Sequence, residues 1–192
     1  MGSFTLGIPT NFIQLLQREL HLDTFVEGGT FRGDSSIFAS NFFSRVITVE
    51  KDENLFLSAQ ARLKNYKNIA IFNGCTTKHI VTHVGPKDRC LFWLDAHWSC
   101  GETAGKDYPC PLLEELELIF SASTALTVLL IDDARQFLAP PPYPHNPKDW
   151  PRIDQIIEIV PSSYSTFVYQ DVIYIVPLAF TERFSSILQP VV

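Results

Sequence analysis

A chain of 192 residues with 46% hydrophobic side chains, 15 phenylalanines among them, can bury one sizeable core and is not an intrinsically disordered protein. Its formal net charge is −6, and the sequence has no cluster of Lys and Arg of the kind that binds nucleic acid by charge. No apolar run approaches the roughly 20 residues needed to cross a bilayer, and residues 1–11 lack the regions of a signal peptide. We therefore expect a cytoplasmic protein with no nucleic-acid or membrane partner, and leave its oligomeric state open, with a homodimer as one arrangement.

Four cysteines, Cys75, Cys90, Cys100 and Cys110, are expected to stay reduced in the cytoplasm. Cys100 and Cys110 share one loop, so a disulfide or a metal site there is the alternative. Their spacing matches no common zinc motif, which favours free thiols.

Apolar segments typical of buried strands alternate with segments of helical periodicity. The first helix has an apolar face formed by Phe12, Leu15, Leu16 and Leu20. Five strands are predicted next, at residues 24–27, 45–49, 68–72, 90–94 and 127–131. Further helices are predicted at residues 35–43, 52–65 and 111–120, and a last one with an inward face of Ile153, Ile156, Ile157 and Val160. The chain closes with a hairpin of residues 165–169 and 172–176.

Residues 139–151 are too rich in proline for a helix or a central strand. We expect a long ordered loop or lid, inserted in a single domain that spans residues 1–192. Strands alternating with helices predict an α/β fold, a doubly wound and mostly parallel sheet, with the C-terminal antiparallel hairpin at one edge. Ligands of such sheets bind beyond the carboxyl ends of the strands.

Acidic residues end four of the five strands: Glu27, Glu50, Asp95 and Asp132. Any single one could be a helix cap, but four on one edge repel one another unless a cation or ligand donors neutralise them. After the first strand, Gly29 and Gly33 let the backbone approach a ligand at a helix N-terminus. Glu27 suits a ligand with an ammonium group rather than a pyrophosphate. Glu50 is placed to accept hydrogen bonds from ribose hydroxyls, with a cap for the next helix as its alternative role.

Together these motifs, Glu-x-Gly-x-x-x-Gly, a strand-end Glu, Asn-Gly-x-Thr, Leu-Asp-x-His-Trp and Ile-Asp-Asp, resemble those of the class I S-adenosylmethionine methyltransferases. They are similar in particular to the metal-dependent O-methyltransferases of the catechol and macrocin type. The resemblance covers Thr24–Arg135 by motif and the hairpin by topology. It implies a Rossmann-like fold and methylation of a small hydroxylated molecule.

Carried over by position, the resemblance implies a role in cofactor binding for seven residues. Glu27, Gly29 and Gly33 would hold the methionine part and Glu50 the ribose, while Gly74, Cys75 and Thr76 would lie near the adenine.

The resemblance also implies a divalent ion, Mg²⁺ or else Mn²⁺ or Ca²⁺, held by Asp95, Asp132 and Asp133. In this reading Asp95 also lies beside the cofactor and takes part in catalysis. The alternative is that the two later aspartates cap the next helix or pair with Arg135.

The catalytic lysine of the catechol-type enzymes is missing, since Ser99 and Cys100 follow Trp98. His97 is the nearest substitute as general base, and its alternative role is that of a packed wall residue. Two segments, Ser99–Pro111 and the proline-rich loop, are predicted to cover the site. A catalytically degenerate binding or interaction protein is the second hypothesis. A nucleotide-binding oxidoreductase is a third, disfavoured by Glu27 and the glycine spacing.

Overall fold

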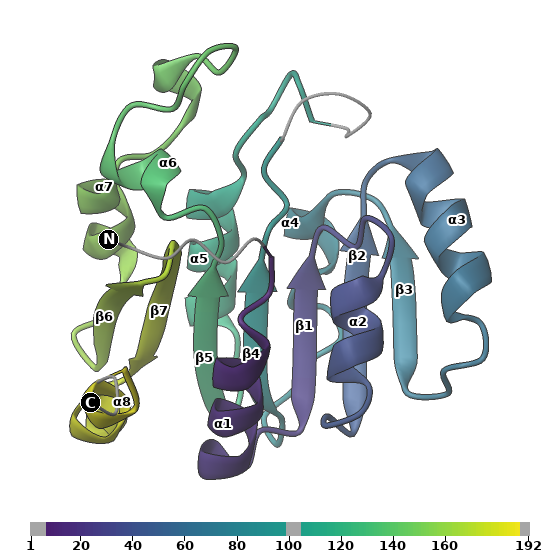
Figure 1. The fold of residues 1–192 in the computed structure, drawn as a ribbon, viewed down its shortest axis with the longest axis horizontal. Helices are drawn as coiled ribbons and strands as arrows, with labels where there is room; N and C mark the ends of the chain where they lie inside the picture. The colour runs from purple at the N-terminus through teal and green to yellow at the C-terminus, as the bar shows by residue number, and fades with distance from the viewer. Residues whose placement is uncertain (1–6, 99–104, 189–192) are drawn as a thin grey trace.

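A seven-stranded sheet organises the computed structural model, which describes residues 7–98 and 105–188 (Figure 1). The strands lie in the order β3-β2-β1-β4-β5-β7-β6. The first five are parallel, and β7 runs antiparallel to both β5 and β6. The strand bounds are β1 Thr24–Gly28, β2 Arg45–Glu50, β3 Ile69–Asn73, β4 Arg89–Leu94, β5 Leu126–Ile131, β6 Tyr164–Tyr169 and β7 Val172–Pro177.

Helices cover both faces of this sheet. The side chains of α1, α2 and α8 pack in one apolar cluster, and those of α5 and α7, with Ile80 after α4, pack in another on the opposite face. The helix α3 packs against β2 and β3, at the edge of the sheet that β3 forms (Figure 1). The helix bounds are α1 Thr10–Leu20, α2 Asp34–Ala39, α3 Glu53–Leu63, α4 Thr76–His79, α5 Leu112–Ser121, α6 Arg135–Leu138, α7 Ile153–Ile159 and α8 Thr181–Leu188.

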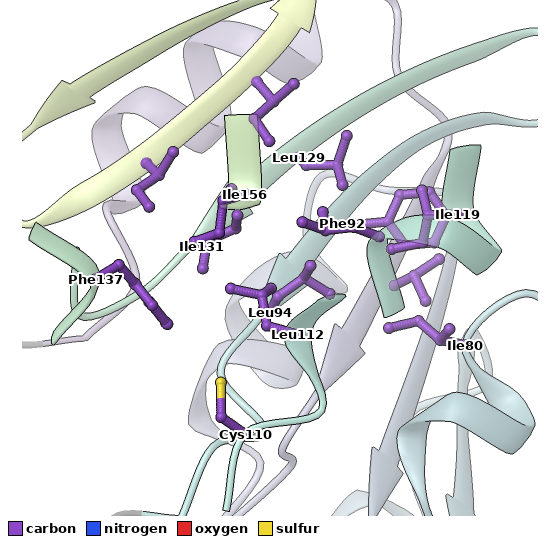
Figure 2. Packing of buried hydrophobic residues seen from close by; sticks show 14 of the residues in the cluster. Ile80, Phe92, Leu94, Cys110, Leu112, Ile119, Leu129, Ile131, Phe137 and Ile156 are labelled. Atoms are coloured by element: carbon purple, nitrogen blue, oxygen red, sulfur yellow. The ribbon is translucent and has the colours of Figure 1, made fainter. Parts of the chain in front are cut away.

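Successive residues of the central strands point to opposite faces of the sheet, and both faces are buried. On β4, Leu91 and Trp93 join the cluster that contains α1. Phe92 and Leu94 join the other cluster, where Figure 2 shows Leu94 beside the helix residue Leu112. This double burial explains why the central strands are apolar at nearly every position.

The predicted fold class is confirmed: all seven predicted strands are present, with the antiparallel hairpin at one edge. The helix after β1 ends at Ala39 rather than Phe43, because residues 40–42 form turns. The short helices α4 and α6 were not predicted, since four residues are too few to display a helical period. The helix α8 was not predicted either. None of the helices in the described part of the chain has the length and apolarity needed to span a membrane.

Leu129, at the centre of β5, has no exposed surface and packs between helices on one face of the sheet. We expect Leu129→Ala to lower the free energy of unfolding by about 2–5 kcal/mol, because the lost methyl groups leave a cavity. Urea denaturation followed by circular dichroism measures the change. The control is Leu57→Ala on α3, where the side chain is 53% exposed and the expected loss is below about 0.5 kcal/mol. Equal losses for the two variants would contradict the assignment of Leu129 to the core.

Candidate functional site

A cavity of about 370 Å³ opens at the carboxyl ends of the parallel strands. Its wall comes from the segments that follow β1, β2, β4 and β5, together with α4 and the residues before α5. This is the edge at which open α/β sheets bind their ligands. The cavity also falls in the size range of small-molecule sites, which begins at roughly 300 Å³.

Gly29, predicted to hold the methionine part of the cofactor, lines this cavity, and packing between strands requires a glycine there. Its φ of +91° is one that residues with a Cβ rarely adopt. A Cβ at this position would also lie 2.4 Å from the carbonyl oxygen of Asp95. The missing side chain therefore lets the end of β1 pack against the end of β4, and the ligand cavity lies beside this contact.

Glu27 does not line the cavity. Its carboxylate is completely buried and accepts hydrogen bonds from the hydroxyls of Ser35, Ser36 and Thr48, the last at 2.6 Å. Burial raises the pKa of Glu27, while these three hydrogen bonds lower it. The expectation that Glu27 faces an ammonium group directly is corrected: its side chain instead ties the first turn of α2 to the sheet, behind the cavity wall.

Gly33 and Gly74 also lie away from the cavity wall. A Cβ at Gly33 would lie 3.2–3.3 Å from the side chain of Leu63 on α3, so this glycine permits helix packing at the start of α2. A Cβ at Gly74 would lie 3.0 Å from the ring of His79. Direct ligand contact is therefore not the reason for a glycine at either position.

Glu50, at the end of β2, lines the cavity with its carboxylate already anchored by the backbone. One oxygen accepts from the N–H of Phe31 at 2.8 Å, and the other accepts from the N–H of Asp52 at 2.9 Å. Burial raises the pKa of Glu50, and these two hydrogen bonds lower it. The alternative role of Glu50 as a helix cap is filled by Asp52, whose side chain accepts from two N–H groups of α3. Each oxygen of Glu50 keeps a lone pair for a hydroxyl on the ligand.

Cys75 and Thr76, predicted to lie near the adenine, line the cavity at the start of α4. The hydroxyl of Thr76 donates a hydrogen bond to the carboxyl of Glu115, a residue of α5 that is only 2% exposed. Burial raises the pKa of Glu115 to about 7, although the bond from Thr76 acts in the opposite direction. Local sequence does not indicate this pairing, because a glutamate in the first turn of a helix is ordinarily explained by the helix dipole.

Asp95, Asp132 and Asp133 are brought together at one end of the cavity, with His97 among them. Nε2 of His97 lies 2.7 Å from Oδ2 of Asp133 and 3.7 Å from Oδ1 of Asp95. Burial acts to lower the pKa of His97, but the bond to Asp133 and the charge of Asp95 outweigh it, so the pKa is raised. Burial and the neighbouring carboxylates raise the pKa of Asp95, against the opposing effect of His97.

The predicted metal site has no support in the described residues. Both oxygens of Asp133 are engaged, one by His97 and the other by Arg135 at 2.7 Å. Asp132 accepts a hydrogen bond from the backbone N–H of Asp133. Within residues 7–98 and 105–188, no group of three or more His, Cys, Asp or Glu side chains is arranged to hold a metal ion. The guanidinium of Arg135 on Asp133 disfavours a divalent cation there, because like charges repel.

Aromatic side chains from the proline-rich loop pack against His97. The ring of Trp150 meets His97 edge to face, at a centroid distance of 5.3 Å, and is only 4% exposed. His145 lies between Trp150 and Trp98, at 4.9 and 5.5 Å from them. The loop predicted as a lid therefore packs its C-terminal end on the acidic end of the cavity, while Tyr143 is 96% exposed.

Several residues that line the cavity were not predicted, namely Phe31, Lys51, Leu55 and Arg135 as a wall residue, whereas Tyr108 belongs to the predicted lid Ser99–Pro111. Lys51 directly follows the strand-end Glu50, so its position after β2 was a usable signal. The others depend on how loops fold back over the sheet, which local sequence does not specify.

Ser99 and Cys100, which stand where the catechol-type lysine would be, lie outside the described residues. Residues 99–104 of the predicted lid Ser99–Pro111 also lie outside them. The alternative of a disulfide or metal site between Cys100 and Cys110 therefore involves a residue that is not described.

No family model and no curated protein matches this sequence. Solved structures do match. The O-methyltransferase TomG from Streptomyces achromogenes, in complex with S-adenosylmethionine, is 16% identical with a TM-score of 0.62, over 91% of this chain and 82% of that chain. An O-methyltransferase from Bacillus cereus with S-adenosylhomocysteine is 18% identical with a TM-score of 0.56, over 88% and 82%. An rRNA methylase from Streptococcus thermophilus is 15% identical with a TM-score of 0.54, over 91% and 99%. The chain therefore has the class I methyltransferase fold.

Glu115 gives the fold a distinctive dependence on pH. Its pKa is about 7 in the folded protein, above the ordinary value of 4.5. The folded state therefore holds this proton more tightly than the unfolded chain. The stability contributed by the group is fully present below pH 4.5 and is lost as the pH rises to about 7.

Relative to wild type, we expect Glu115→Gln to gain about 3 kcal/mol in free energy of unfolding between pH 4 and pH 8, because glutamine carries no titrating proton. Urea unfolding of both proteins across this range measures the difference. Glu117→Gln, on the exposed side of the same helix, is the control and should give a nearly constant difference from wild type. A constant difference for Glu115→Gln as well would show that the carboxyl does not titrate abnormally.

Proposed function

We propose that this protein is an S-adenosylmethionine-dependent methyltransferase that methylates a hydroxyl oxygen of a small molecule. The observation that carries the proposal is the cavity at the carboxyl ends of the strands, with the anchored carboxylate of Glu50 in its wall. It lies in a fold shared with proteins whose structures contain S-adenosylmethionine or S-adenosylhomocysteine.

The residues along the cavity suit the parts of this cofactor in order. Gly29 and Asp95, where β1 meets β4, would border the methionine part. Glu50 would accept hydrogen bonds from the ribose hydroxyls, as acidic residues at this strand do in dinucleotide folds. Cys75 and Thr76 would border the adenine. Glu27 would act indirectly, by holding the first turn of α2 behind the wall.

At the other end of the cavity, His97 would receive the proton of the acceptor hydroxyl. The cofactor, when bound, supplies a methyl group already activated by its sulfonium charge, so the protein has mainly to align the acceptor oxygen with it. Asp133 and Asp95 would stabilise the imidazolium that forms on His97. No metal is included in this mechanism, because Arg135 and His97 already occupy the carboxylate of Asp133.

A small acceptor is favoured over RNA. The acidic residues Asp95, Asp132 and Asp133 gather in the cavity wall, and the whole chain carries a formal net charge of −6. Both features repel phosphate, whereas proteins bind nucleic acid through clustered positive charge. The hypothesis of a catalytically degenerate protein corresponds to cofactor binding without turnover.

Calorimetric titration tests the cofactor assignment. We expect S-adenosylhomocysteine and S-adenosylmethionine to bind and NAD to give no heat. Glu50→Gln should weaken S-adenosylhomocysteine about ten- to a hundredfold, because hydrogen bonds to a charged group contribute about 1.5–3 kcal/mol. Glu53→Gln, on the exposed start of α3, should leave the affinity unchanged. Binding of NAD instead, or equal affinities for the two variants, would refute the proposed cofactor or its site.

Turnover is tested with methyl-labelled S-adenosylmethionine and a panel of small hydroxylated molecules, including catechols and sugars. We expect His97→Gln to lower the rate about 10²–10⁴-fold while the affinity for S-adenosylhomocysteine stays within about twofold of wild type. Because no metal takes part, EDTA should leave the wild-type rate unchanged. Loss of activity with EDTA would overturn the metal-free mechanism, and cofactor binding without transfer to any acceptor would favour the degenerate protein.

A further inference from the structure

The turn between β6 and β7 is connected to His97 by a line of alternating charges. Asp171, in this turn, forms an ion pair with Nη1 of Arg135. Nη2 of the same guanidinium lies 2.7 Å from Oδ1 of Asp133, and the other oxygen of Asp133 lies 2.7 Å from His97. One arginine therefore joins the C-terminal hairpin to the acidic end of the cavity.

Asp171 is held firmly in this position. Its side chain is only 7% exposed, and Oδ1 also accepts the backbone N–H of Arg135 at 2.9 Å. Its carbonyl oxygen accepts the N–H of Ala134 at 2.8 Å. Gln170 and Asp171 both have positive φ, +47° and +66°. They form a two-residue turn, and the residues on either side of it, Tyr169 and Val172, pair in the hairpin. The hairpin turn is thus attached to the first residues of α6 by backbone and side chain together.

Arg135 gains its orientation from this attachment. Its side chain is 47% exposed, and a guanidinium in that position samples many rotamers unless both of its edges are bound. Asp171 binds one edge, which directs the other edge to Asp133. Asp133 itself has a φ of +55°, a conformation that persists where surrounding contacts enforce it. Its contacts with Arg135 and His97 hold its carboxylate in place.

We propose that Asp171 is a positioning residue for the candidate active site: through Arg135 it fixes the carboxylate of Asp133 and thereby the ring of His97. The inference rests on the proposed function for its catalytic meaning, but the coupling itself is a property of the protein alone. A purely structural role is the competing explanation, in which Asp171 only caps the start of α6. The two roles differ in whether Arg135 is needed for the effect.

The test follows the ring nitrogens of His97 by NMR of protein labelled with ¹⁵N-histidine. The chain has five histidines, and His97→Gln assigns the signal. Asp171→Asn keeps an oxygen that can cap α6 and tolerates positive φ, but it removes the charge that holds Arg135. Asp154→Asn, which breaks the exposed pair with Arg152, is the matched control.

We expect Asp171→Asn to move the ring signals of His97, and Asp154→Asn to leave them in place. Arg135→Gln should move them too, and adding Asp171→Asn to Arg135→Gln should cause no further change. His97 signals at their wild-type positions in Asp171→Asn would overturn the proposal. So would a shift of the same size in the Arg135→Gln background, because the influence would then bypass Arg135.

Titration with S-adenosylhomocysteine separates this inference from the proposed function. The affinity of Asp171→Asn should stay within about twofold of wild type, since Asp171 acts on the far end of the cavity from Glu50. Failure of the wild-type protein to bind the ligand would refute the proposed function, while the NMR comparison would still decide the coupling. With an active acceptor in hand, kcat of Asp171→Asn should fall about ten- to a hundredfold, since small misplacements of catalytic groups have effects of this size.

Discussion

Four parallel strands end in register, and the candidate site depends on this alignment. Gly28 of β1 pairs with Val49 of β2 and with Leu94 of β4, and Leu94 pairs with Ile131 of β5. The next residue along each strand therefore emerges at the same edge: Gly29, Glu50, Asp95 and Asp132. At the centre, a Cβ on Gly29 would collide with the carbonyl of Asp95, so the two middle strand ends approach as closely as their backbones permit.

This alignment concentrates carboxylates, and each one is stabilised in a different way. Hydroxyl groups surround Glu27, and backbone N–H groups hold Glu50. Asp133 pairs with the guanidinium of Arg135 and is hydrogen-bonded to the imidazole of His97. Glu115 on α5 accepts a hydrogen bond from the hydroxyl of Thr76 on α4, and burial holds its proton to a higher pH. The two ends of the cavity differ accordingly: backbone N–H groups hold the carboxylate of Glu50 at one end, and an ion pair with Arg135 holds that of Asp133 at the other.

The sheet and the strand-end positions could be predicted from sequence because they follow from apolar segments and turns. Side-chain directions were predicted less well. Glu27 pairs with Thr48 and Trp93, and Trp93 lies on the face covered by α1 and α2, so the alternation of a strand directs Glu27 toward α2. A position at a strand end predicts that a residue lies near the site. Whether its side chain reaches the cavity depends on which face of the sheet it points to, since successive side chains of a strand alternate between the two faces.

The predicted metal ligands illustrate a different limit. Asp95, Asp132 and Asp133 do come together, as the motif implied, yet their partners come from elements whose arrangement local sequence does not contain. Arg135 belongs to a four-residue helix, and its position is set by a turn 36 residues later in the chain. Whether a group of acidic residues can bind a metal therefore depends on the basic side chains that the fold places beside them, here Arg135 and His97. The acidic motif alone does not decide it.

Backbone strain in the described residues concentrates around the same charged end. Of the five non-glycine residues with positive φ, Asp133, Gln170 and Asp171 belong to it, and Phe31 lines the cavity. Such conformations cost of order 1–3 kcal/mol each and persist where surrounding contacts enforce them. The hairpin supplies such contacts through Asp171, and the proline-rich loop adds Trp150 against the ring of His97. The end proposed for the acceptor thus combines His97, which follows β4, with partners from the C-terminal third of the chain. At the end proposed for the cofactor, Gly29, Glu50, Cys75 and Thr76 instead follow the first three strands.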